Sequence, residues 1–175
     1  KSILMNTDNK LIYEGKAKKI LANKNPEEVI VEFKDDATAF NAAKKSTFKG
    51  KGELNCFISE TIFKYLINQG IPTHYISSNS KSSFVAQKVD IIPIEVVVRN
   101  IAYGSICKQT NIKPGRVFKE PLIDFYFKDD ELNDPLLTLD RIKLMHIIGM
   151  EELIFIKELT NKINLILTDF FSNID

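Results

Sequence analysis

Arg99 directly follows a run of branched apolar residues, and a Gly104-Ser105 step comes soon after it. The run, residues 94–98, predicts a buried strand whose end delivers the guanidinium to a site. Arginine is scarce, since only three of the 24 basic residues are arginines. A guanidinium binds planar or multidentate anions better than an ammonium does, so the pattern indicates a phosphate or carboxylate site. Two plainer alternatives stay open: a structural ion pair for Arg99, and a helix N-cap for Ser105.

Lys16 and Lys18 flank Ala17 just after Gly15. Alternate residues of a strand share one face, so the two ammonium groups would lie about 7 Å apart along the chain. That spacing could straddle the phosphates of a nucleotide. The alternative is a solvated hairpin edge, where lysines discourage strand pairing.

Glu95 lies inside the same apolar run as the residues that precede Arg99. An unpaired carboxylate is costly in such a setting, so the residue needs a partner. It could face water at a sheet edge, pair with a lysine, or accept a hydrogen bond from a ligand.

Two further polar segments lack a clear apolar period. Residues 34–52 predict a mobile loop, and residues 128–135 predict an acidic turn at Asn133-Asp134-Pro135. The lysines of the loop could suggest RNA contact, but a formal net charge of +1 argues against nucleic-acid binding. His74 and His146 show no metal-ligand spacing.

The length of 175 residues allows one compact domain or two small lobes. The two cysteines form no disulfide framework, and the first residues do not resemble a signal sequence. No apolar run is long enough for a membrane span. A cytoplasmic protein is therefore expected. Strands followed by mixed elements predict an α+β fold. Strands are expected at 11–13, 17–21, 29–33, 84–89, 91–98 and 120–128, and helices at 53–66, 104–110, 137–145 and 151–171.

Four segments together resemble the SAICAR synthetase family of purine biosynthesis. They are Tyr13 to Lys18, Asp35 to Asn41, Glu95 to Ser105 and Lys128 to Pro135. The resemblance implies a two-lobed α+β fold related to ATP-grasp and kinase-like folds, with a nucleotide-covering lobe at 1–92 and a substrate-binding lobe at 93–175. Periodicity alone would not reveal this architecture.

The resemblance also implies roles for individual residues. ATP would contact Lys16, Ala17, Lys18 and Glu95. Carboxyaminoimidazole ribotide (CAIR) would contact Arg99, Ser105 and Asn41, and Lys128 with Asp129 would lie at the reacting groups.

The implied reaction uses ATP and Mg²⁺ to activate the CAIR carboxylate as an acyl phosphate, which the amino group of L-aspartate then attacks. The expected partners are small-molecule substrates, with no nucleic acid and no membrane, and a homodimer is the oligomer considered. The competing function is a generic nucleotide-dependent phosphotransferase, which would use Lys16, Lys18 and Glu95 but not the Arg99 and Ser105 pair.

The family pattern continues past Asp175 into segments that carry acidic metal ligands. We therefore expect no metal site within these 175 residues, and no ligation by them alone.

Overall fold

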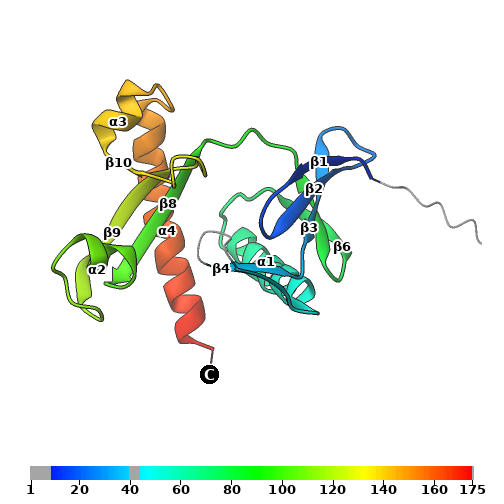
Figure 1. Cartoon of the computed structure of the whole chain (residues 1–175), viewed down its shortest axis with the longest axis horizontal. Coiled ribbons are helices and arrows are strands. Elements are labelled where there is room, and N and C mark those ends of the chain that lie inside the picture. The colour runs from blue at the N-terminus through cyan, green and yellow to red at the C-terminus, as the bar shows by residue number, and fades with distance from the viewer. Residues whose placement is uncertain (1–8, 40–43, 175) are drawn as a thin grey trace, which may run out of the picture. The chain divides into compact units, whose positions relative to one another are not determined.

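The computed structural model describes residues 9–39 and 44–174. The chain divides into two compact units, Lys1–Asp90 and Ile91–Asp175, two residues before the expected boundary. Antiparallel sheets and helices occur in both units, which confirms the α+β class (Figure 1). None of the helices in the described residues is both long enough and apolar enough to span a membrane.

The first unit contains a five-stranded antiparallel sheet in the order β1-β2-β3-β7-β6. Its strands are β1 (Leu11–Glu14), β2 (Lys18–Ala22), β3 (Glu28–Phe33), β6 (Tyr75–Ser80) and β7 (Ser83–Gln87). Four of them match the predicted strands. The strand β6 was not predicted, because its exposed residues are mostly serine and asparagine and carry no apolar alternation.

The predicted loop at 34–52 is wrong, because β4 (Asp36–Ala39) and β5 (Lys44–Thr47) pair as an antiparallel hairpin. Backbone hydrogen bonds hold such a pair without an apolar face, so its sequence gives no period to detect. The helix α1 (Lys51–Asn68) begins two residues before the expected start at Glu53.

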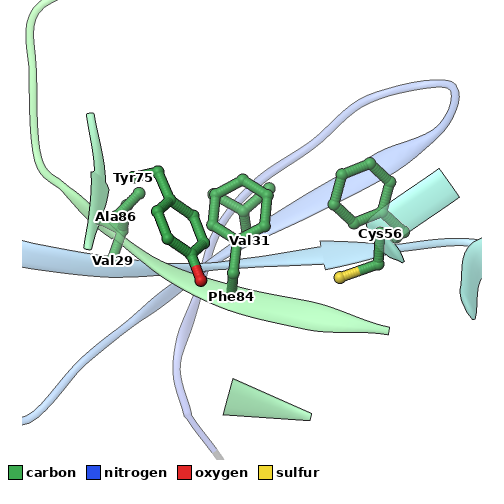
Figure 2. Close-up of a cluster of buried hydrophobic side chains, with 7 residues drawn as sticks. Val29, Val31, Cys56, Tyr75, Phe84 and Ala86 are labelled. Atoms are coloured by element: carbon green, nitrogen blue, oxygen red, sulfur yellow. The ribbon is translucent and has the colours of Figure 1, made fainter. Parts of the chain in front are cut away.

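The core of the first unit lies between α1 and one face of the sheet. Phe84 is 1% exposed and packs with Val29 and Val31 of β3, with Tyr75 and with Cys56 of α1 (Figure 2). Burying a side chain of this size contributes about 1.5 to 3 kcal/mol. This packing fixes the sheet from which the Lys16 and Lys18 segment extends.

The second unit contains a three-stranded sheet in the order β10-β9-β8. Its elements are β8 (Ile94–Ile101), α2 (Ser105–Gln109), β9 (Val117–Phe127), β10 (Leu136–Leu137), α3 (Leu139–Leu144) and α4 (Met150–Ser172). The predicted helices and the long strand are present. The two-residue strand β10 was not predicted and continues directly from the expected turn.

The strand β8 is an edge strand and is only half buried, so the expectation of a buried strand at 94–98 is wrong. The strand also continues to Ile101, so Arg99 lies within it and not beyond its end. Ile94 and Val96 pack against a core that contains Phe125 of β9 and Leu153 of α4. Residues of a strand alternate between its faces. Glu95, Val97 and Arg99 therefore lie on the face opposite that core.

Candidate functional site

Arg99 and Ser105 are brought together in the second unit, as the sequence predicts. The guanidinium Nη2 donates to Ser105 Oγ at 3.0 Å, and Nη1 donates to the carbonyl of Tyr103 at 3.5 Å. Nε lies 3.5 Å from Asp124 Oδ2 on β9. A guanidinium has five N–H donors, and these three contacts use only three of them.

Ser105 opens α2 but does not cap it. The N-cap is Gly104, at φ 70°, and no side chain closes that helix end. The plain N-cap alternative for Ser105 is therefore wrong. Its hydroxyl group instead accepts the hydrogen bond from Arg99.

The structural ion pair considered for Arg99 does exist, but it is a long one. The Arg99 and Asp124 side chains are 20% and 15% exposed. A hydrogen bond with Tyr126, followed by the contact with Asp124, raises the pKa of Arg99, so the group stays cationic. Asp124 orients the guanidinium through Nε, and the contacts with Asp124, Tyr103, Ser105 and Tyr126 leave one of the five N–H groups for an oxygen of a phosphate or carboxylate.

Two asparagines that were not predicted as site residues hold β8 against α4 next to Arg99. Asn100 Nδ2 donates to Asn164 Oδ1 at 2.8 Å, and Asn164 Nδ2 donates back to Asn100 Oδ1 at 3.0 Å. Asn164 is 8% exposed on α4. A polar residue among the apolar positions of α4 was the only signal in the sequence, because the partners are 64 residues apart.

Glu95 is exposed and pairs in register with Tyr126. Of the three alternatives, the water-facing carboxylate matches this position, and a ligand could still reach it. Because Glu95 and Arg99 are four residues apart on one strand face, they lie about 13 Å apart.

Lys128 and Asp129 follow β9 in a tight turn. Lys128 is exposed, and its N–H donates to the carbonyl of Pro93 at 3.0 Å. Asp129 Oδ1 accepts from the N–H groups of Glu131 and Leu132 at 3.0 and 3.1 Å. One oxygen of Asp129 is thus used to hold the turn, which matches the plainer interpretation of this acidic segment.

Lys16 and Lys18 lie in the first unit, but the expected shared strand face is wrong. Lys16 is in the bend between β1 and β2, whereas Lys18 is the first residue of β2. The N–H of Gly15 donates to the carbonyl of Lys18 at 2.8 Å and closes the turn that contains Lys16 and Ala17. A turn, and not a strand, therefore presents the first of the two ammonium groups.

The Lys18 ammonium group lies over an aromatic ring. Its Nζ is 5.0 Å from the centroid of Phe33. Although the residue keeps an exposed surface, burial of the ammonium group lowers the pKa of Lys18. Burial, and then the charge of Lys18, also lowers the pKa of His74. A partly desolvated cation gains more from an anionic ligand than a fully hydrated one does.

Two remaining predictions concern Asn41 and a metal. Asn41 lies outside the described residues. Among the described residues, no three His, Cys, Asp or Glu side chains group closely enough to hold a metal ion. A surface pocket of about 520 Å³ in the first unit is lined by Lys19, Lys34, Asp35, Glu53 and neighbouring residues. Its mixed charges do not select for an anion, and neither Lys16 nor Lys18 lines it.

Comparisons with known proteins agree over nearly the whole chain. Residues 11–175 match the model of the SAICAR synthetase family. A phosphoribosylaminoimidazole-succinocarboxamide synthase from Prochlorococcus marinus subsp. pastoris (strain CCMP1986 / NIES-2087 / MED4) is 63% identical over 170 residues, which are 97% of this chain and 70% of that protein.

Solved structures show the same similarity. The crystal structure of the synthase from Ehrlichia chaffeensis has a TM-score of 0.91 and 47% identity, and the match covers 94% of this chain and 69% of that one. A type-2 SAICAR synthetase in complex with ADP has a TM-score of 0.87 and 42% identity, with coverage of 91% and 68%. The chain thus spans about 70% of the first relative's length.

Proposed function

The chain belongs to the SAICAR synthetase family, and on that premise we propose that it serves the ATP-dependent ligation of L-aspartate to the carboxylate of CAIR, giving SAICAR, ADP and phosphate in purine biosynthesis. The match of 63% identity over 170 residues carries this proposal. It favours the ligase over a generic phosphotransferase, for which the Arg99 and Ser105 pair would have no use.

Each substrate is an anion, and the described residues supply cations and donors to match. Lys16 and Lys18 bind nucleotide phosphates beside the backbone of Ala17, and a relative in complex with ADP supports a nucleotide site. Arg99 and Ser105 bind the ribotide, because a guanidinium and a hydroxyl group 3.0 Å apart present N–H and O–H donors together. Fixed donors of this kind stabilise charge that develops during the reaction.

Glu95, Asn41, Lys128 and Asp129 keep the roles that the family resemblance implies. Glu95 accepts a hydrogen bond from the nucleotide, Asn41 contacts the ribotide, and Lys128 acts near the reacting carboxylate. Asp129 positions Lys128, since its carboxylate holds the turn that follows Lys128. The described residues contain no group of three His, Cys, Asp or Glu side chains that could hold a metal ion, so no step is assigned to Mg²⁺ through them.

A chimera tests the function directly. The matching segment of the Prochlorococcus marinus relative is replaced by this chain, and SAICAR formation is measured by mass spectrometry with ATP, Mg²⁺, CAIR and aspartate. We expect turnover within about tenfold of the relative, which serves as the positive control, since sequences this similar share a site. A chimera that folds and binds ADP but forms no SAICAR would contradict the proposal and favour the phosphotransferase.

A further inference from the structure

Lys34 lies just after β3, and three acceptors surround its ammonium group. Nζ is 2.7 Å from Glu14 Oε1 and 2.8 Å from Asp36 Oδ2. It also lies 3.4 Å from the carbonyl oxygen of Gly15. An ammonium group has three N–H donors, so each of them has an acceptor here. The Lys34 side chain is only 18% exposed.

Lys34 also holds the same turn through its backbone. Its N–H donates to the carbonyl of Ala17 at 2.9 Å. The carbonyl groups on either side of Lys16, those of Gly15 and Ala17, therefore accept hydrogen bonds from one residue. Lys34 thus fixes both ends of the turn that carries Lys16 and leads into Lys18.

The backbone on both sides of Lys34 is held against the start of α1. The next residue, Asp35, accepts from the N–H groups of Gly50 and Gly52 at 3.3 and 2.8 Å at the start of α1. Gly52 packs so closely that a Cβ atom there would lie 2.6 Å from the carbonyl oxygen of Phe33. Because α1 holds the residues on both sides of Lys34, Lys34 cannot follow the Gly15–Ala17 turn if the turn moves. A displacement of the turn would therefore break its contacts with Lys34.

We propose that Lys34 is a positioning residue that holds the Gly15–Ala17 turn so that Lys16 and Lys18 meet the nucleotide phosphates. The inference rests on the proposed function, since it takes those two lysines as the phosphate ligands. Lys34 acts through the turn and not on the nucleotide, because Glu14, Asp36 and Gly15 already occupy its donors.

Calorimetric titration of the chain with ADP and with adenosine tests this proposal. Adenosine lacks the phosphates, so a displaced turn should weaken ADP binding and leave adenosine binding unchanged. For Lys34→Met we expect the dissociation constant of ADP to rise by about tenfold, within the loss that misplaced binding groups produce. Lys34→Arg, which keeps the charge, should recover most of the affinity. Lys24→Met removes an exposed lysine of the same unit and serves as the control.

Glu14→Gln separates positioning from direct phosphate contact. This variant keeps the Lys34 charge but weakens its hold on the turn, so positioning predicts a threefold to tenfold loss of ADP affinity. Direct contact predicts no loss, or tighter binding, because an anion has been removed. Unchanged ADP affinity in Lys34→Met, or an equal loss for ADP and adenosine, would also overturn the proposal. If the unchanged chain does not bind ADP, the proposed function fails instead.

Discussion

Lys34 in the first unit directly follows β3, and Arg99 in the second lies within β8, and these two cations use their donors differently. Lys34 has two carboxylates at 2.7 and 2.8 Å, and all three of its donors have acceptors. Arg99 has one carboxylate at 3.5 Å, and its other partners are neutral: the Ser105 hydroxyl group at 3.0 Å, the Tyr103 carbonyl at 3.5 Å and Tyr126. A cation with short contacts to two anions holds structure, whereas one with a single distant anion keeps attraction for a ligand. We therefore expect Lys34 to act as a positioning residue and Arg99 to bind a ligand.

The largest expected effect comes from the geometry of the Arg99 donors. Arg99→Lys keeps the charge but loses the planar arrangement of N–H groups, so CAIR binding should weaken by about 2 to 3 kcal/mol, or roughly 30- to 150-fold. ADP binding should change less than about twofold. Titration calorimetry measures both, and Arg141→Lys in α3 is the matched control. Equal loss for both ligands, or for neither, would make Arg99 a structural residue like Lys34.

The next effect concerns Lys18, which differs from Lys34 because burial lowers its pKa. Lys18→Met should weaken ADP binding by about 1 to 3 kcal/mol, the range for a lost charge-assisted contact. The same change should leave the free energy of unfolding equal or higher at neutral pH, because it removes a partly desolvated charge. A loss of ADP affinity with no loss of stability would identify Lys18 as a binding residue. Titration calorimetry measures the affinity, and thermal unfolding measures the stability.

The sign of that stability change follows from proton binding. The folded-state pKa of Lys18 lies below the unfolded value of about 10.4, so between the two the unfolded chain binds more protons. Stability from this group therefore rises with pH in that window. Lys18→Met should lose this rise, and a variant that keeps it would show that another group causes it.

A smaller effect is expected from the partner of Arg99. Asp124→Asn removes the anion at Nε but keeps a hydrogen-bond acceptor, so CAIR affinity should fall by about threefold through poorer orientation of the guanidinium. Because the Asn100 and Asn164 pair still holds the strand, the unfolding free energy should change by less than about 1 kcal/mol. A loss as large as that of Arg99→Lys would show that Asp124 itself contacts the ligand.

The main elements of the two units and the contact between Arg99 and Ser105 could be predicted from the sequence. The contacts of Lys34 and of Asn100 could not, for a physical reason. Apolar periodicity predicts β3, α1 and α4, and the Gly-Ser step after β8 predicts that Ser105 meets Arg99. The role of Lys34 could not be predicted, because Glu14 and the Gly15 carbonyl lie 20 and 19 residues away and meet it only through strand pairing. The Asn100 and Asn164 pair depends in the same way on packing between a strand and a distant helix.

The smallest expected effect is the acid dependence of the Lys34 cluster. The hydrogen bond from Lys34 lowers the pKa of both Glu14 and Asp36. Because the folded values lie below the unfolded ones, about 4.3 and 3.9, their contribution to stability is present above that range and is lost as pH falls through the lowered values. Lys34→Met should therefore be less stable than the unchanged chain at pH 7 and equally stable near pH 2. Urea unfolding at a series of pH values measures this difference.

Lys19 also lowers the pKa of both carboxyl groups by its charge. Lys19→Met should therefore also be less stable than the unchanged chain at pH 7 and equally stable near pH 2, but with a smaller difference. A difference between the chain and Lys34→Met that does not depend on pH would mean that the side chain stabilises the turn by packing and not by its charge.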